Sequence, residues 1–162
     1  IGFSIAILVI FIGIHSLARS MQGENKSGSD LAGLASIFAI LIAGIYMVSL
    51  GLELIATEKE SDWIQSGGDA LSAYTLSEAM TRSIFVFDGL VMLFLGIAIL
   101  KQKNFNKIIG GLFTFFGVCV LFSIFSQGDN WAGMIWFIGF LGFPIITAVT
   151  GFLTLRQIRN KT

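Results

Sequence analysis

The chain is short of the residues from which most enzymes and soluble domains are built. Its 162 residues include one cysteine, one histidine and one proline, and only 12% of them are charged. A soluble domain carries about 25% charged residues, so this shortage favours lipid rather than water as the solvent. The single cysteine, Cys119, excludes an intrachain disulfide and any cysteine-rich metal site.

The same scarcity limits the chemistry that the chain can perform. A metal site needs two or more converging His, Cys or carboxylate groups, and we expect His15 and Cys119 in different halves of the bundle. A lone histidine at a membrane edge argues against a Ser-His-Asp set, and the chain has no haem-attachment motif. The net charge is zero, which argues against a nucleic-acid partner. We therefore expect no catalytic residue, no metal and no cofactor. His15 is interpreted as an interfacial histidine; the alternatives are an axial ligand or a contact to a partner's cofactor.

Apolar residues, by contrast, make up 55% of the chain, with 16 phenylalanines and 19 glycines. Five apolar runs are each about 17 to 25 residues long, the length that a membrane-crossing helix needs. They lack the polar stripe at a 3.6-residue period that marks helices of soluble proteins. The chain begins without methionine inside the first run, so we expect that an upstream piece is missing. The sequence predicts an all-α single domain, a polytopic membrane bundle of about five transmembrane helices at 1–17, 31–55, 76–100, 108–125 and 131–155.

The basic residues predict the orientation of these helices. Two segments are basic, and their charged residues are Lys101, Lys103, Lys107, Arg156, Arg159 and Lys161. The first segment connects the third and fourth runs and the second follows the fifth run, so both fall on one side of the membrane. Lys and Arg are enriched in cytoplasmic loops, which makes this side cytoplasmic. The N-terminus is then outside, the C-terminus inside, and the net acidic loop 56–75 outside.

The bundle is expected to be organised around the stretch from Thr75 to Lys101. Thr75 and Glu78 form a T-x-x-E capping box, so we expect the helix to begin there. Glu78 and Arg82 are one turn apart and can form an ion pair at the outer interface. Asp88 lies about 9 Å further along the helix axis, inside the apolar run.

Asp88 is the candidate intramembrane polar site, because an ionisable side chain in a membrane is costly and is by default a functional hypothesis. Its partners must come from other helices at a similar depth. Four side chains meet this condition and can hydrogen-bond a carboxyl group: Tyr46, Ser49, Ser123 and Trp136. One interpretation is a protonated, hydrogen-bonded aspartic acid that holds helices together. The other is a proton or cation site.

Two further patterns have more than one interpretation. Small residues repeat at four-residue spacing in the second run: Ala32, Ala35, Ser36, Ala39 and Ala43. They form a face for close helix packing, either within the chain or in a dimer. In the fifth run Pro144 removes a backbone hydrogen bond and is expected to kink its helix. Broken helices build ion sites in transporters, although kinked membrane helices are common without that role.

The stretch SEAMTRSIFVFDGLVMLFLGIAIL carries a resemblance to a known family. Its order of Ser-Glu, three residues, Arg, five residues and Asp, with a basic loop after the apolar run, resembles multi-helix bacterial membrane proteins that share a domain of unknown function. The sequence LAGL at 31–34 is similar to the start of that family's first helix. The resemblance would extend to about residue 155 and maps Glu78, Arg82 and Asp88 onto recurring polar positions. This chain has an extra helix before the match and fewer helices after it. The resemblance implies a bacterial membrane protein and no particular activity.

We therefore expect an integral protein of the bacterial inner membrane without a catalytic centre of its own. It would be an accessory or scaffolding subunit of a larger membrane protein complex, with membrane lipid and other membrane protein subunits as its partners. The alternative is a small transporter or a proton- or cation-conducting protein that uses Asp88. A third hypothesis is a membrane enzyme or lipid-binding protein whose chemistry comes from a bound cofactor.

Overall fold

The computed structural model describes residues 2–57, 65, 67–103, 107–125 and 130–159. Its helices are α1 (Gly2–Ser20), α2 (Ser29–Thr57), α4 (Ala70–Gln102), α5 (Lys107–Phe125) and α6 (Asn130–Arg159). Each of them overlaps one of the predicted apolar runs. The described residues contain no strand, which confirms the all-α prediction.

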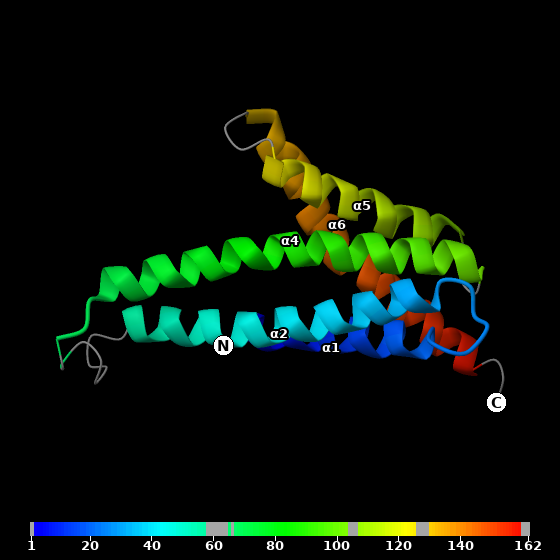
Figure 1. Ribbon diagram of the computed structural model, residues 1–162, viewed down its shortest axis with the longest axis horizontal. Helices are drawn as coiled ribbons and strands as arrows, with labels where there is room; N and C mark the ends of the chain where they lie inside the picture. Colours follow the sequence, from blue (N-terminus) through cyan, green and yellow to red (C-terminus); the bar gives the residue numbers. More distant parts are fainter. Residues whose placement is uncertain (1, 58–64, 66, 104–106, 126–129, 160–162) are drawn as a thin grey trace.

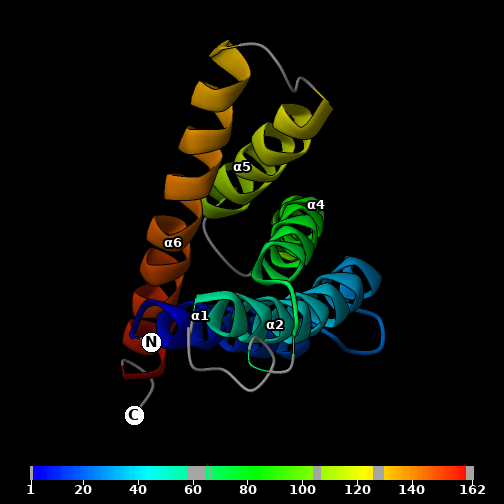
Figure 2. The same ribbon diagram turned by 90° about the vertical axis from the view of Figure 1, so that its left-hand side faces the viewer.

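Helix α4 occupies the centre of the arrangement (Figures 1 and 2). It packs along α2 on one side and along α5 on the other, while α1 lies against α2 and α6 lies against α5. Helices α1 and α6 meet only over a short stretch, where the rings of Phe11 and Phe143 are 5.8 Å apart. Helix α4 is therefore the element through which the two halves of the bundle are joined.

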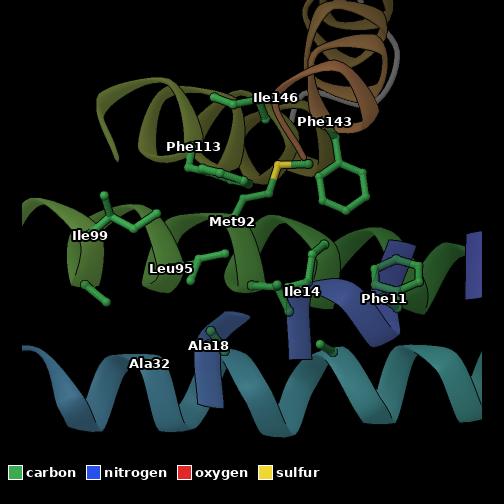
Figure 3. Close-up of a cluster of buried hydrophobic side chains, with 14 of the residues drawn as sticks. Phe11, Ile14, Ala18, Ala32, Met92, Leu95, Ile99, Phe113, Phe143 and Ile146 are labelled. Atoms are coloured by element: carbon green, nitrogen blue, oxygen red, sulfur yellow. The ribbon is translucent and has the colours of Figure 1, made fainter. Parts of the chain in front are cut away.

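The core is formed by apolar side chains that converge on α4. Met92, Leu95 and Ile99 have no exposed surface. In Figure 3, Met92 points from α4 towards Phe113 of α5 and Phe143 of α6. The same helix thus supplies side chains to the interfaces with α2, α5 and α6.

Three glycines allow α4 and α5 to approach each other closely. A Cβ atom added at Gly96 would lie 2.5 Å from the backbone nitrogen of Thr114. One added at Gly117 would lie 2.6 Å from the backbone nitrogen of Leu93, and one at Gly89 would lie 2.8 Å from the side chain of Leu121. A larger residue at Gly96 or Gly117 would therefore push the two helices apart. Small residues at interfaces are the usual means by which membrane helices pack.

Helix α4 begins earlier than the sequence predicts. Its N-cap is Asp69, whose carboxylate accepts hydrogen bonds from the backbone N–H groups of Leu71 and Ser72 and from the Ser72 hydroxyl. Thr75 lies inside the helix, where its hydroxyl donates to the carbonyl of Leu71 at 2.8 Å. The predicted capping box of Thr75 and Glu78 is therefore wrong, and the last part of the predicted outer loop is helical.

The physical reason is that the sequence offers a better start six residues earlier. Aspartate is a stronger N-cap than threonine, and Gly67, with a φ of 91°, turns the chain just before it. The hydrogen bond from the Ser72 hydroxyl, together with the backbone N–H of Leu71, lowers the pKa of Asp69 below its usual value. The cap is thus made by the ionised carboxylate, next to the positive end of the helix dipole.

The small residues of α2 form an internal packing face. Ala32, Ala35 and Ala39 have no exposed surface, and Ser36 is 4% exposed. Helices α1 and α4, which pack along α2, cover this face. Packing within the chain is therefore the correct interpretation of the four-residue repeat, and the dimer interpretation is wrong, because a second copy cannot reach buried residues.

Pro144 lies inside α6, which continues on both sides of it. The neighbouring glycines bring this part of α6 onto α5: a Cβ atom at Gly139 would lie 2.7 Å from Val120, and one at Gly142 would collide with the ring of Phe116. The segment around Pro144 is thus used for helix packing.

The contact between α4 and α5 can be tested by adding a methyl group at one of its glycines. Gly96→Ala should destabilise the bundle by about 1–3 kcal/mol, because the added methyl group overlaps the backbone of α5. Gly111→Ala is the matched control, since a Cβ atom at Gly111 meets no atom within 4 Å. The measurement is the thermal unfolding midpoint of both variants in detergent. Equal midpoints for the two variants would contradict the described approach of the helices.

Candidate functional site

Asp88 lies in the middle of α4 and is 6% exposed. It shares one helix face with the buried residues Ile84, Val91, Met92 and Leu95, so the spacing that buries these apolar side chains also buries the carboxyl group. Its Oδ1 atom is buried and has no hydrogen-bond partner among the residues that the structure describes. A buried polar atom without a partner costs about 1–3 kcal/mol, and proteins retain few of them. Asp88 therefore stands out as a candidate for function.

The structure does not bring Tyr46 or Ser49, two of the four predicted partners, to Asp88. Ser49 lies opposite Ser77, about 16 Å from Asp88 along the axis of α4. Tyr46 is half-buried against the core, and no hydrogen bond joins it to Asp88 in the part of the chain that the structure describes. The side chains of Ser123 and Trp136 lie outside the described residues.

The register between α2 and α4 explains this outcome. The two helices are antiparallel, and Phe38 of α2 marks the level of Asp88, because its ring lies 5.5 Å from that of Phe87. Tyr46 and Ser49 therefore lie two to three turns away from this level. The predicted partners depend on the depth of each residue from its predicted helix end. This depth is wrong for α4, because the helix begins six residues earlier than predicted.

Ser49 instead belongs to a hydroxyl cluster between α2 and α4. Its Oγ atom lies 2.9 Å from Oγ of Ser77 and 3.0 Å from Oγ1 of Thr81. The Ser77 hydroxyl donates to the Ser49 carbonyl at 3.0 Å, and the Thr81 hydroxyl donates to the Ser77 carbonyl at 2.9 Å. With the Ser49 hydroxyl donating to Oγ of Ser77, every hydroxyl in the cluster has a partner. The cluster joins α2 and α4 by side-chain hydrogen bonds.

A second polar contact joins α1 and α2. The Nδ1 atom of His15 lies 2.8 Å from Oγ of Ser36 and 3.2 Å from the Ser36 carbonyl oxygen. Depending on the tautomer, Nδ1 either accepts from the hydroxyl or donates to the carbonyl. His15 is half-buried in this contact, so it serves helix packing and is not simply an interfacial side chain.

The remaining predicted residues lie apart from these contacts. Glu78 and Arg82 are both exposed on α4, and the described side chains form no ion pair between them. Cys119 is a free, half-buried cysteine of α5. On α6, Oγ1 of Thr147 is a second buried polar atom without a hydrogen-bond partner.

The described surroundings of Asp88 suit proton exchange better than cation binding. Among the described residues, no group of three or more His, Cys, Asp or Glu side chains could hold a metal ion. A bound cation such as Ca²⁺ or Mg²⁺ takes about six oxygen ligands, whereas Oδ1 of Asp88 has no polar neighbour in hydrogen-bond contact. A proton needs a single acceptor atom, so a carboxyl group in this setting can exchange a proton but cannot by itself hold a cation.

Sequence reasoning missed Ser36, Ser77 and Thr81 as hydrogen-bond partners. Ser77 and Thr81 are four residues apart and therefore share a helix face, a signal that could have been used. The predicted capping box at Thr75 obscures this signal, because it places both residues at the surface start of the helix. The pairing of His15 with Ser36 depends on the register of α1 against α2 and has no local signal.

Comparisons with known proteins add no identification. No protein-family model, no curated protein and no solved structure gave a significant match to the chain.

The hydroxyl cluster can be tested by a double-mutant cycle of Ser49→Ala and Ser77→Ala. The expected coupling is about 0.6–1.7 kcal/mol, the range of hydrogen bonds between membrane helices. Ser83→Ala is the control, because the Ser83 hydroxyl donates only within its own helix, to the Met80 carbonyl at 2.7 Å. The free energy of unfolding in detergent gives the coupling. Strictly additive effects of the two substitutions would show that the cluster does not join the helices.

Proposed function

We propose that the chain is an integral membrane protein without a catalytic centre of its own, and that it serves as an accessory or scaffolding subunit of a larger membrane protein complex. The observation that carries this proposal is the apolar outer surface of the helices. Large apolar side chains are exposed on every described helix, for example Val9 (62%), Ile37 (58%), Leu71 (69%), Phe115 (55%) and Phe152 (66%). A soluble monomer rarely exposes such extended apolar surface.

The low burial of α2 and α4 within the chain supports lipid as the solvent. Helices α2 and α4 are each long and apolar enough to cross a membrane. Only 28% of the most apolar window of α2 is buried inside the chain, and 50% of that of α4. The core helix of a soluble protein would be mostly buried. Helices α1, α5 and α6 contain shorter apolar stretches packed on these two, and we propose that all five cross the membrane.

The positions of the basic residues support an orientation with the N-terminus outside and the C-terminus inside. The connection between α1 and α2 lies against the end of α4, where Nε2 of Gln102 donates to the carbonyl of Met21 at 2.6 Å. Arg19 and Lys26 therefore join the lysines of the α4 end, and α6 also finishes at this end of the molecule (Figure 1). Such a basic end is typical of the cytoplasmic side. We also propose that this membrane is the bacterial inner membrane and that the chain is related to the family that it resembles.

A surface for neighbouring subunits is available at the opposite end. There the last turns of α2 and the first turns of α4 (residues 49–57 and 70–81, the outer extension) reach past the other helices (Figure 1). The outer extension carries exposed apolar side chains, including Leu54, Leu71 and Tyr74. The hydroxyl cluster holds its two helices together, so it would present these side chains as one unit.

A second candidate function rests on Asp88. Asp88 is a buried carboxyl group whose Oδ1 atom has no hydrogen-bond partner among the described residues, and packing does not explain it. It favours a proton-conducting protein as the alternative, with Asp88 as the group that exchanges the proton.

The accessory role is tested by purifying the chain from native membranes in a mild detergent. We expect it to elute with the same membrane protein in constant ratio through two successive separations. An unrelated membrane protein carrying the same tag is the control. Elution of the chain alone, folded and monodisperse, would contradict the accessory role.

The orientation is tested by labelling single cysteines in intact cells. In a Cys119→Ala background, Ser66→Cys should react with a membrane-impermeant reagent, and Asn160→Cys should react only after the cells are opened. The opposite labelling pattern would overturn the orientation. Extraction of the chain from membranes by alkaline carbonate would overturn the integral membrane protein itself.

The two candidate functions are separated by proton flux in liposomes. Under the main proposal, wild type and Asp88→Asn show the same background flux. Asp88→Leu should be at least as stable as wild type, because it removes a buried, partnerless oxygen that costs about 1–3 kcal/mol. Wild-type flux that disappears in the folded Asp88→Asn variant would replace the accessory proposal by the proton-conducting one.

A further inference from the structure

The lysines at the junction of α4 and α5 form a basic rim at the edge of the apolar surface. Lys101 and Lys103 close α4, Lys107 opens α5, and all three are exposed. Lys103 adopts a left-handed backbone with a φ of 55°, and its N–H donates to the Ile99 carbonyl, which ends the helix. The chain therefore turns back at this point and holds the lysines of both helices at one end of the bundle.

These lysines are not neutralised within the described part of the chain. No ion pair joins Lys101, Lys103 or Lys107 to a described acidic side chain, although Glu24 and Asp30 lie at the same end of the bundle. Lys26, in contrast, donates to the carbonyls of Ser20 and Gln22 within its own loop. The lysines of α4 and α5 therefore leave positive charge available to an outside ligand at this end of the bundle, where Arg19 is also exposed.

The apolar surface continues directly up to these lysines. Leu100 precedes Lys101 and is 36% exposed, and Ile108 follows Lys107 and is 66% exposed. One turn further on α5, Leu112 is 41% exposed. A lysine next to lipid-facing side chains at a helix end extends its ammonium group to the level of the lipid headgroups. This position suits a lipid phosphate better than an acidic protein segment, which would approach from the aqueous side.

We propose that the basic rim, formed by Lys101, Lys103 and Lys107, binds the headgroups of anionic phospholipids in the membrane that holds the protein. This inference rests on the proposed membrane location and adds the lipid class. Three unpaired ammonium groups at the edge of an apolar belt match a negatively charged headgroup above acyl chains. A zwitterionic headgroup, which has no net charge, would gain little from them.

The test uses the full chain in a neutral detergent, titrated with phosphatidylglycerol or with phosphatidylcholine. The readout is the lipid concentration that half-saturates the rise in thermal midpoint. We expect phosphatidylglycerol to stabilise the protein at low ionic strength, and phosphatidylcholine and inorganic phosphate to have no comparable effect. Each lysine removed should weaken the response about fivefold, and high ionic strength should abolish it.

The variants separate charge from structure. Lys101→Gln/Lys103→Gln/Lys107→Gln should lose the preference for phosphatidylglycerol, whereas replacing the same three lysines by arginine should keep it. Arg82→Gln, at the opposite end of α4, is the control and should behave as wild type. If the glutamine variant does not fold, the arginine variant and the salt dependence of the wild type still decide the question.

Three outcomes would overturn the inference: equal responses to both lipids, a preference that survives in the glutamine variant, or equally strong stabilisation by soluble polyglutamate. The last outcome would assign the basic rim to an acidic protein partner. All of them leave the membrane location intact, because resistance of the chain to alkaline carbonate extraction is measured separately in phosphatidylcholine vesicles.

Discussion

The close approach of α4 and α5 at Gly96 and Gly117 determines how the rest of the bundle is placed. Lipid offers no hydrophobic force between helices, so association in a membrane depends on close packing and hydrogen bonds. A Cβ atom at either glycine would meet backbone of the other helix at 2.5–2.6 Å, which leaves no room for adjustment. Helix α5 in turn positions α6 through Gly139 and Gly142, while α2 packs on the other side of α4 and α1 packs on α2. A change at the α4–α5 contact would therefore move α5 and α6 together.

Some polar groups of the described interior hold helices together, whereas Asp88 does not. The hydroxyls of Ser49, Ser77 and Thr81 satisfy one another across α2 and α4, and His15 meets Ser36 across α1 and α2. Asp88 lies among apolar side chains, with its Oδ1 atom unpartnered. A fully satisfied network costs little to bury, whereas a partnerless oxygen is a standing cost. The central helix keeps this unfavourable burial at Asp88. Asp88, and not the hydroxyl cluster, therefore supports the proton-conducting alternative.

The helices could be predicted from the sequence, because long apolar runs leave few other solutions. The contacts between them could not. The sequence predicts Ser49 at the depth of Asp88 from the expected helix ends, whereas the Asp69 cap shifts the start of α4 by six residues. Antiparallel register is a tertiary property, set by close contacts such as that between Gly96 and Thr114. The small-residue face of α2 was visible in the sequence, but only the packing of α1 and α4 decides that it is internal.

Helix lengths place the outer extension relative to a membrane. Helices α1 and α5 have 19 residues each, about 28 Å, which matches a hydrocarbon core of about 30 Å. Helix α4 has 33 residues, about 50 Å, so roughly 20 Å of it must tilt or leave the hydrocarbon. In the proposed membrane location, a boundary at Lys101 would place the other boundary near Thr81. The residues beyond it include the hydroxyl cluster and exposed Glu53 and Glu78, which suit the headgroup region. In this proposed placement, Asp88 would lie about 10 Å inside the hydrocarbon, too deep for its carboxyl group to reach water along its own helix.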